Sequence, residues 1–246
     1  MTATRKKRLD LLVVERGLAK SRETAQTLIM SGNILINDQP MDKPGMQVAE
    51  DARIVSRKPD MPYVSRGGVK LAHAISEIGI DVRGLMCLDV GASTGGFTDC
   101  LLQSGAAHVY AVDVGYGQLD WKLRQDNRVT VVERTNIRYV TPEILPTDFD
   151  LITIDVSFIS LKIVIPAINP FLKPAGHILA LVKPQFEVGR EQVGKGGVVR
   201  DENLHEAVIA ELKSYFEEFG LVFQAVTPSP ILGPKGNREF LMYLGR

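Results

Sequence analysis

The stretch DVGASTGGFTDCLL, residues 89–102, carries the clearest structural signal in this sequence. The apolar residues before it predict a β-strand that ends near Asp89, small residues then predict a tight turn, and a helix is expected to begin near Phe97. A dinucleotide-binding turn would have the pattern G-x-G-x-x-G, and a nucleoside triphosphatase loop would have G-x-x-x-x-G-K-[ST]. This turn follows an acidic residue and has no lysine, so a phosphate ligand is disfavoured.

Alternating strands and helices continue from this turn to the end of the chain. The predicted strands cover residues 86–91, 108–115, 129–134, 150–156, 177–184, 221–227 and 239–244, and the clearest helices cover 67–79 and 202–220. Continuous apolar strands separated by amphipathic helices indicate an α/β fold, with a seven-stranded, mainly parallel sheet and helices on both faces. Ligands of such Rossmann-like folds collect at the carboxyl ends of the strands.

An acidic residue, Asp113, closes the second predicted strand 24 residues after Asp89. A carboxylate there can accept both hydroxyls of a ribose, and a turn of small residues lets the backbone approach an uncharged adenosine. D-x-G-x-x-x-G followed by such an acid is the pattern of S-adenosylmethionine-dependent methyltransferases of class I. The alternative is a turn that only packs a helix on the sheet, with Asp113 in solvent. The residues predicted to bind S-adenosylmethionine are Asp89, Gly91, Ala92, Ser93, Thr94, Gly95, Gly96, Phe97, Asp113 and Asn136.

Asn136 follows the third predicted strand, where its amide is expected to contact the adenine. The alternative is that it only stabilises the turn in which it lies.

The composition bounds the class of protein. The chain has 246 residues, of which 45% are hydrophobic and 24% are charged, so it can form a sizeable core. No apolar run reaches the roughly 18 residues that a membrane-spanning helix needs, and no signal peptide is recognised, so a cytoplasmic protein without a membrane partner is predicted. The two cysteines and four histidines have no ligand spacing, so no metal site is predicted.

The first sixty residues are more basic than the rest. They carry 11 Lys and Arg against 8 Asp and Glu, whereas residues 61–246 carry 18 against 21. Clustered basic residues on a small module indicate a polyanionic partner, although a solvated basic tail is an alternative.

The pattern of apolar and turn residues in the same sixty residues predicts helices over 8–18 and 21–32. It also predicts a hairpin over 33–41 that turns at Asp38–Pro40. A strand is expected at 52–55, followed by a linker at 56–62.

This α+β module resembles the S4 RNA-binding domain. The resemblance rests on RLD at 8–10, AKSRETAQTLIMSGNILIN at 19–37 and KPGMQV at 43–48. It implies a surface that binds structured RNA through phosphate contacts. The basic residues expected on that surface are Arg5, Lys6, Arg8, Lys20, Arg22 and Lys43. For Arg22, pairing with Glu23 or with solvent is the alternative.

The fourth predicted strand ends in DVSF, residues 155–158. Enzymes that methylate exocyclic amines usually have [DN]-P-P-[YF] at this place, and here Asp155 and Phe158 remain while both prolines are missing. An amine acceptor is therefore disfavoured, although not excluded. Lys183 ends the fifth strand at the same edge of the sheet, where it is a candidate base or acceptor-orienting group.

Four charged residues resemble the Lys-Asp-Lys-Glu tetrad of the FtsJ-like ribose 2′-O-methyltransferases: Lys70, Asp155, Lys183 and Glu239. The motifs VSRGGVKL (64–71), AVDVG (111–115), LVKPQFE (181–187) and VGKGGVVRD (193–201) extend the resemblance. Together with the S4-like module, they identify the chain as a member of the hemolysin A/TlyA family, ribosomal RNA 2′-O-methyltransferases that modify cytidines. One departure is Tyr63, which stands where the family usually has a tryptophan.

The resemblance implies an S4-like RNA-binding domain at 1–60, an FtsJ-like domain at 61–246, and ribosomal RNA and ribosomal subunits as partners. Lys183 would be the base or hydroxyl-orienting group, Asp155 would fix it, and Lys70 and Glu239 would position the acceptor ribose. The oligomeric state stays open.

Three basic residues of the larger domain are also expected to contact RNA: Arg66, Lys195 and Arg200. The last two lie in a polar, glycine-rich segment at 187–205, which is predicted to be a mobile loop over the strand ends. A flexible connector is the alternative interpretation of that segment.

Two other functions of the protein remain as alternatives. One is a hemolysin or cytolysin, and the other is a non-catalytic RNA-binding factor of ribosome assembly.

Overall fold

The computed structural model describes residues 5–19, 21–57 and 61–246. The predicted RNA contact Lys20 lies outside these residues. The chain divides into two compact units, Met1–Met61 and Pro62–Arg246, whereas the sequence pattern placed the division one residue earlier. Among the described residues, no helix has both the length and the apolar character needed to cross a membrane. Within the same ranges, no group of three or more His, Cys, Asp or Glu residues is placed to hold a metal ion.

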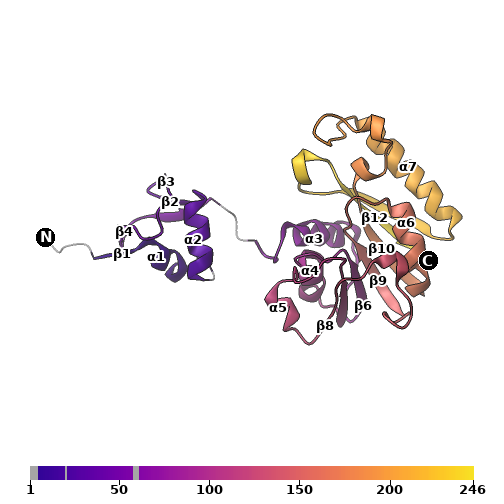
Figure 1. Ribbon diagram of the computed structural model, residues 1–246, viewed down its shortest axis with the longest axis horizontal. Helices are drawn as coiled ribbons and strands as arrows, with labels where there is room; N and C mark the ends of the chain where they lie inside the picture. The colour runs from indigo at the N-terminus through magenta and orange to yellow at the C-terminus, as the bar shows by residue number, and fades with distance from the viewer. Residues whose placement is uncertain (1–4, 20, 58–60) are drawn as a thin grey trace. The chain divides into compact units, whose positions relative to one another are not determined.

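The described residues of the first unit form two helices and five short strands. Figure 1 draws this unit at the indigo end of the colour range. Its elements are β1 (Lys6–Arg8), α1 (Leu9–Glu15), α2 (Arg22–Met30), β2 (Ile34–Ile36), β3 (Gln39–Met41), β4 (Gln47–Ala49) and β5 (Ile54–Ser56). β1 pairs with β4, and β2 lies between β3 and β5. Ser21 caps α2 by accepting a hydrogen bond from the Thr24 amide, as its sequence position predicts. Apolar side chains of both helices and of β2, β4 and β5 form the core.

The hairpin of this unit turns earlier than predicted. Ile36 pairs with Gln39, so the two turn residues are Asn37 and Asp38, with φ of 49° and 67°. Two residues with positive φ make the kind of tight turn that matches the twist of a hairpin, and Asn and Asp tolerate that conformation. Pro40 therefore lies in β3, an edge strand, where its missing N–H removes no necessary ladder bond.

The second unit contains a seven-stranded sheet in the order β11-β12-β10-β9-β6-β7-β8. The strands are β6 (Met86–Val90), β7 (His108–Val112), β8 (Val129–Val132), β9 (Phe149–Ile154), β10 (Leu172–Val182), β11 (Val222–Pro228) and β12 (Phe240–Gly245). Neighbouring strands from β8 to β10 pair in parallel, and β12 pairs antiparallel with both β10 and β11. The predicted α/β fold with a mainly parallel sheet is confirmed.

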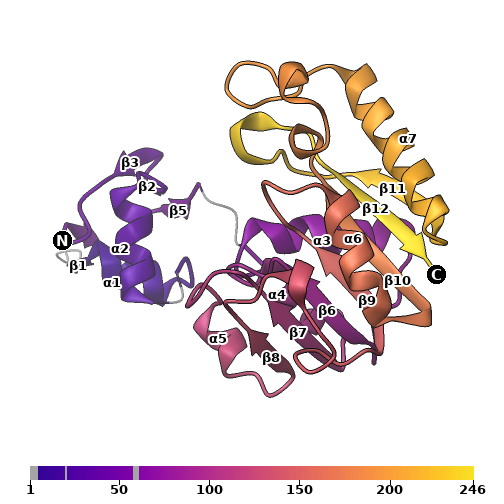
Figure 2. The same cartoon turned by 45° about the vertical axis from the view of Figure 1, so that its right-hand side comes forward.

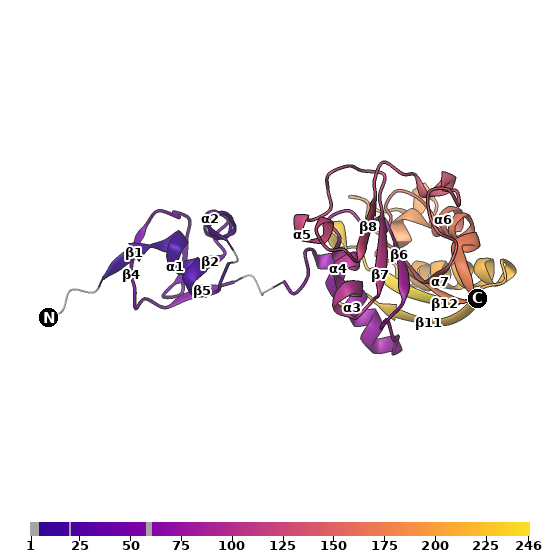
Figure 3. The ribbon, with the colours of Figure 1, turned by 90° about the horizontal axis from the view of Figure 1, so that it is seen from below.

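Helices cover both faces of this sheet. The α-helices are α3 (Arg66–Ile78), α4 (Gly96–Gln103), α5 (Trp121–Arg124), α6 (Leu161–Ile168) and α7 (Glu202–Glu218). Short 3-10 helices lie at η1 (Ile137–Tyr139), η2 (Asn169–Phe171), η3 (Pro184–Phe186), η4 (Arg190–Gln192) and η5 (Pro234–Gly236). Seen from below, α3 and α4 lie on one side of the strands and α6 and α7 on the other (Figure 3).

Each face of the sheet has its own hydrophobic core. One cluster joins α6 and α7 to the sheet around Phe149, Ile165 and Phe216, and the other joins α3 and α4 around Leu71, Phe97 and Leu101. The central strands are apolar on both faces because both faces are covered. This packing fixes the carboxyl ends of β6, β9 and β10 and the start of the antiparallel β12 at one edge of the sheet (Figure 2).

Candidate active site

The glycine turn follows β6 at this edge and leads directly into α4. Gly91 has a φ of +85°, and a Cβ there would lie 2.5 Å from the backbone oxygen of Asp155. Gly95, with a φ of +96°, precedes the first helical residue, and a Cβ on it would lie 2.3 Å from a methyl carbon of Leu123. Only glycine satisfies both the backbone conformation and the space at these positions. The turn is thus held tightly against β9 on one side and α5 on the other.

Asp89 lies inside the protein beneath the turn. Its carboxylate accepts hydrogen bonds from Thr98 Oγ1 (2.6 Å) and Thr153 Oγ1 (3.3 Å). Burial raises the pKa of Asp89 to about 7, although the hydrogen bond from Thr98 acts in the opposite direction. With its side chain fully buried, Asp89 is placed to fix the turn to β9 and α4, and a direct contact with the cofactor stays a prediction.

Asp113 lies just after β7, across from the glycine turn. One carboxylate oxygen accepts a hydrogen bond from the Ser93 amide (2.8 Å), and the other accepts one from the Gly115 amide (2.6 Å). Each oxygen keeps a further lone pair that can accept a hydroxyl. The carboxylate is therefore oriented by the turn and has acceptor capacity for the predicted ribose contact.

Asn136 has a structural task in the protein. Its side-chain oxygen accepts hydrogen bonds from the Arg138 backbone amide (3.1 Å) and from Arg138 Nε (3.3 Å), and it caps the helix η1. This is the turn-stabilising alternative that the sequence left open. The adenine contact of Asn136 remains a prediction.

Lys183 and Asp155 form an ion pair in the cleft beside the turn. Lys183 Nζ lies 2.6 Å from Asp155 Oδ1 and donates a hydrogen bond to Ser157 Oγ at 3.0 Å. The lysine is 8% exposed. The two predicted roles of Lys183, as base and as hydroxyl-orienting group, both stay predictions.

Lys70 and Glu239 form a second ion pair in the same cleft. Lys70 Nζ lies 2.5 Å from Glu239 Oε2, and the two residues are 7% and 2% exposed. Glu239 Oε1 is buried without a hydrogen-bond partner among the described residues. A buried acceptor of this kind needs a donor, which a substrate hydroxyl can provide.

These groups line one cleft of about 320 Å³. Its walls contain the four predicted catalytic residues, Arg66, and the predicted cofactor residues Gly91, Ala92, Ser93, Thr94, Gly96 and Phe97. The residues that line the cleft do not include the predicted cofactor residues Asp89, Gly95, Asp113 and Asn136. Its volume is at the lower end of the roughly 300–1,000 Å³ typical of small-molecule sites. The turn, with its close backbone and small side chains, fits S-adenosylmethionine as a ligand.

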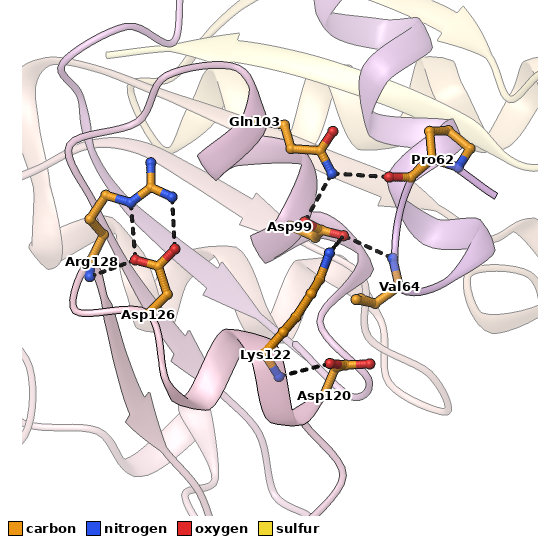
Figure 4. A network of polar contacts seen from close by, with 8 residues as sticks. All are labelled: Pro62, Val64, Asp99, Gln103, Asp120, Lys122, Asp126 and Arg128. Carbon is orange, nitrogen blue, oxygen red and sulfur yellow. Dashed lines mark hydrogen bonds and ion pairs between the residues drawn. The ribbon is translucent and has the colours of Figure 1, made fainter. Parts of the chain in front are cut away.

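A polar network that the sequence did not reveal attaches the start of the second unit to α4 (Figure 4). Asp99 accepts hydrogen bonds from the Val64 amide (2.9 Å), Gln103 Nε2 (3.0 Å) and Lys122 Nζ (2.9 Å). Gln103 also donates to the backbone oxygen of Pro62 at 3.0 Å. Burial opposes the charge on Asp99, but these hydrogen bonds together lower its pKa. The segment before α3 is thereby fixed to α4, the helix that follows the glycine turn. α3 itself carries Arg66 and Lys70.

A second missed residue, Asn237, anchors the segment that was predicted to be a mobile loop. Its side chain accepts a hydrogen bond from the Val199 amide (3.1 Å) and donates to the backbone oxygens of Gly197 (3.0 Å) and Pro234 (3.2 Å). The segment also has η4 and a bridge between Gly194 and Val198. Lys195 and Arg200, both exposed, are thus presented by a segment that is attached next to Glu239.

The basic residues of the first unit differ in their surroundings. Asp10, fully buried in α1, accepts hydrogen bonds from Arg8 (2.9 and 3.0 Å), Arg22 (3.0 Å) and Gln26 (3.1 Å). The hydrogen bond from Arg8 is the largest of the influences that lower the pKa of Asp10. Arg22 therefore pairs with Asp10 rather than with Glu23. Both arginines stay partly exposed, and Arg5, Lys6 and Lys43 are exposed.

Comparison with known proteins identifies both units. Residues 63–246 match the FtsJ-like methyltransferase family, and residues 7–54 match the S4 domain. YqxC of Bacillus subtilis is 49% identical over 246 residues, which cover 98% of this chain and 86% of that protein. TlyA of Mycobacterium tuberculosis, a 16S/23S rRNA (cytidine-2′-O)-methyltransferase, is 46% identical over 241 residues, covering 98% and 90%. A solved structure from Streptococcus thermophilus, whose name refers to a hemolysin, has a TM-score of 0.76 and 42% identity, covering 99% and 90%.

The sheet, the glycine turn and the cleft define a protein of the methyltransferase class. The chain belongs to the family of FtsJ-like methyltransferases that carry an N-terminal S4 domain, which confirms the predicted family and fold class.

Proposed function

We propose that this protein transfers a methyl group from S-adenosylmethionine to the ribose 2′-oxygen of cytidine in ribosomal RNA, within ribosomal subunits or their precursors in the cytoplasm. The observation that carries the proposal is the pair of buried ion pairs, Lys183–Asp155 and Lys70–Glu239, in one cleft with the glycine turn. The activity in the name of the M. tuberculosis relative, which matches nearly the whole chain, supports the choice of substrate.

We assign one side of the cleft to the methyl donor and the other side to the acceptor. Gly91, Ala92 and Ser93 line it on the donor side, and Asp113 is fixed behind them by the Ser93 amide. S-adenosylmethionine, the methyl donor of this enzyme class, supplies a methyl group on a positively charged sulfur when bound. We assign Asp113 to its ribose hydroxyls and the main-chain turn to its amino-acid part.

The chemistry required of the protein is alignment. A lone pair of the ribose 2′-oxygen forms the bond to the methyl carbon while the carbon–sulfur bond breaks, and that electron pair remains on sulfur. The hydroxyl proton leaves to a basic group or to water. Holding the reactants in near-attack geometry can contribute roughly 7–11 kcal/mol, so orientation is the main effect expected here.

Each member of the tetrad has a role that follows from its contacts. Lys183 is held by Asp155 and Ser157 and lines the cleft, and we assign its side chain to the acceptor oxygen. We assign Asp155 to the side of the cleft on which the sulfonium would lie. We assign the unpartnered oxygen of Glu239 to a hydrogen bond from an acceptor hydroxyl, and Lys70 holds that carboxylate in place.

Phe158, three residues after Asp155, offers a surface for an unpaired base. Its side chain is 90% exposed, its φ is +66°, and its ring lies 5.0 Å from that of Phe186. A bulky residue with positive φ is uncommon and is found at functional sites. Sequence-specific enzymes that act on RNA commonly stack an unpaired base on an aromatic ring. We assign Phe158 to the base of the acceptor nucleotide.

The first unit supplies RNA affinity in this account. Its exposed cations Arg5, Lys6 and Lys43, with the partly exposed Arg8 and Arg22, suit a phosphate-reading S4 surface. In the second unit, Arg66 lines the cleft, and Lys195 and Arg200 are presented beside it.

Mapping of 2′-O-methylation in ribosomal RNA, in cells with and without the gene, tests the proposal. A cytidine whose 2′-O-methyl group disappears with the gene and returns with a plasmid copy is expected. Identical methylation maps would contradict the proposed function. The same strains separate the alternatives, because a plasmid copy with Lys183→Ala would restore a non-catalytic assembly function but not methylation, and lysis of erythrocytes by purified protein would indicate a cytolysin.

A further inference from the structure

A second cavity lies beside the catalytic cleft, at the same edge of the sheet. Its volume is about 440 Å³, and it is bounded by the segment before α7, the end of β11 and the start of β12. Glu239 forms part of the wall of both cavities. A ligand in the second cavity therefore lies directly next to whatever occupies the tetrad.

Two arginines line this cavity. The side chain of Arg238 is 62% exposed, and its contact with Glu202, whose side chain is 76% exposed, is long at 3.7 Å. Exposed ion pairs of this kind contribute little free energy, so Arg238 can exchange Glu202 for another anion. Within the described part of the chain, nothing pairs with the exposed guanidinium of Arg200.

The rest of the wall is largely apolar and is held in place. Phe240 and Leu232 contribute apolar surface, and His205 lies 5.6 Å from the Phe240 ring. The imidazole Nε2 of His205 is hydrogen-bonded to the Val199 oxygen at 2.9 Å. Asn237 fixes Val199 from the other side, as described above. Two cations at the rim and an apolar, ordered wall match a nucleotide, which has a phosphate at one end and a base at the other.

We propose that this cavity binds the nucleotide adjacent to the acceptor in a single-stranded segment of the RNA, with its phosphate contacted by Arg200 and Arg238. The inference rests on the proposed function, because the acceptor ribose is placed at Glu239. Arg238 then belongs to the RNA-binding surface. The sequence analysis predicted Arg200 as an RNA contact but did not predict Arg238. Arginine suits the task because its planar fork binds phosphate oxygens in a bidentate manner.

Binding of a fluorescein-labelled hexacytidylate to the full chain, measured by anisotropy over a range of salt concentrations, tests this subsite. The test variant is Arg200→Ala with Arg238→Ala. The matched control is Arg83→Ala with Arg128→Ala, which also removes two exposed arginines. These control residues lie at the opposite edge of the sheet, just before β6 and β8, and pair with Asp81 and Asp126.

Each phosphate contact on a single strand contributes roughly 0.7 to the slope of the logarithm of affinity against the logarithm of salt concentration. Because both arginines contact the same phosphate, the test variant should lower the magnitude of this slope by about 0.7 and weaken binding at low salt by at least about tenfold. The control variant should match the wild-type chain. Equal slopes for the test and control variants would overturn the subsite, as would wild-type binding too weak to measure. Because this readout needs no turnover, a wild-type chain that binds in this way but methylates no RNA would contradict only the proposed function.

Discussion

Removal of the Glu239 carboxylate should strongly destabilise the second unit. Lys70 Nζ lies 2.5 Å from Glu239 Oε2, and both side chains are almost completely buried. Glu239→Ala leaves the Lys70 ammonium without its partner in a site that is largely closed to water. Loss of one partner of a buried ion pair costs about 3–5 kcal/mol of unfolding free energy. In a unit of this size each kcal/mol shifts the melting temperature by roughly 2–4 °C, so a decrease of roughly 6–20 °C is expected.

Thermal unfolding of the full chain, followed by circular dichroism, measures this effect. The double variant Lys70→Met with Glu239→Leu removes both charges and should recover most of the lost stability, because apolar residues of similar size often replace a buried ion pair without loss. Asp81→Ala is the matched control, since it breaks the exposed pair with Arg83 and should change the unfolding free energy by no more than about 1 kcal/mol. A melting temperature for Glu239→Ala within about 2 °C of wild type, the effect of roughly 1 kcal/mol, would refute the reasoning.

Three further results are expected. Asp113→Ala should weaken S-adenosylmethionine binding by roughly 1.5–3 kcal/mol in calorimetry, because a charge-assisted contact to the ribose is lost; unchanged affinity in a folded variant would count against the assignment. Asp89, with a pKa raised from 3.8 to about 7, holds a proton in the folded state that the unfolded chain releases, so its contribution to stability falls as the pH rises between these values. Asp89→Asn should remove this component from the pH profile of urea unfolding, and an identical profile would show that Asp89 ionises normally. A chain of residues 62–246 should bind S-adenosylmethionine like the full protein and lose ribosomal RNA affinity, and equal RNA affinity of both chains would argue against the proposed division of tasks.

The sheet was predictable because its signal is local. The continuous apolar strands and the amphipathic helices between them are visible in short windows of sequence, and the parallel order follows from their alternation. The turn of the hairpin was placed one to two residues too late, for a local reason as well. Pro40 is a strong turn signal in sequence, but Asn37 and Asp38 adopt the two positive φ values that the tight turn requires.

The site was only partly predictable, because its contacts join distant parts of the chain. Lys70 and Glu239 are 169 residues apart, and only a family resemblance connected them before the fold was known. From sequence, Asp10 is expected to be a solvated residue in the first turn of a helix. Its carboxylate is instead buried and accepts hydrogen bonds from Arg22 and Gln26 of the next helix. Asn237 gives no signal at all in sequence, since its role is defined by backbone groups 38 and 40 residues earlier.

Single-turnover transfer of a labelled methyl group to ribosomal RNA, followed by digestion to nucleosides, tests the central claim most directly. The wild-type chain should place the label in 2′-O-methylcytidine. Lys183→Ala should bind S-adenosylmethionine normally but transfer the group about a hundredfold more slowly or worse, the usual scale of acid–base and positioning effects. Lys183→Arg should also fail, because its planar fork aims differently at the acceptor. Label on a base instead of a ribose, or a near-normal rate for Lys183→Ala, would contradict the account.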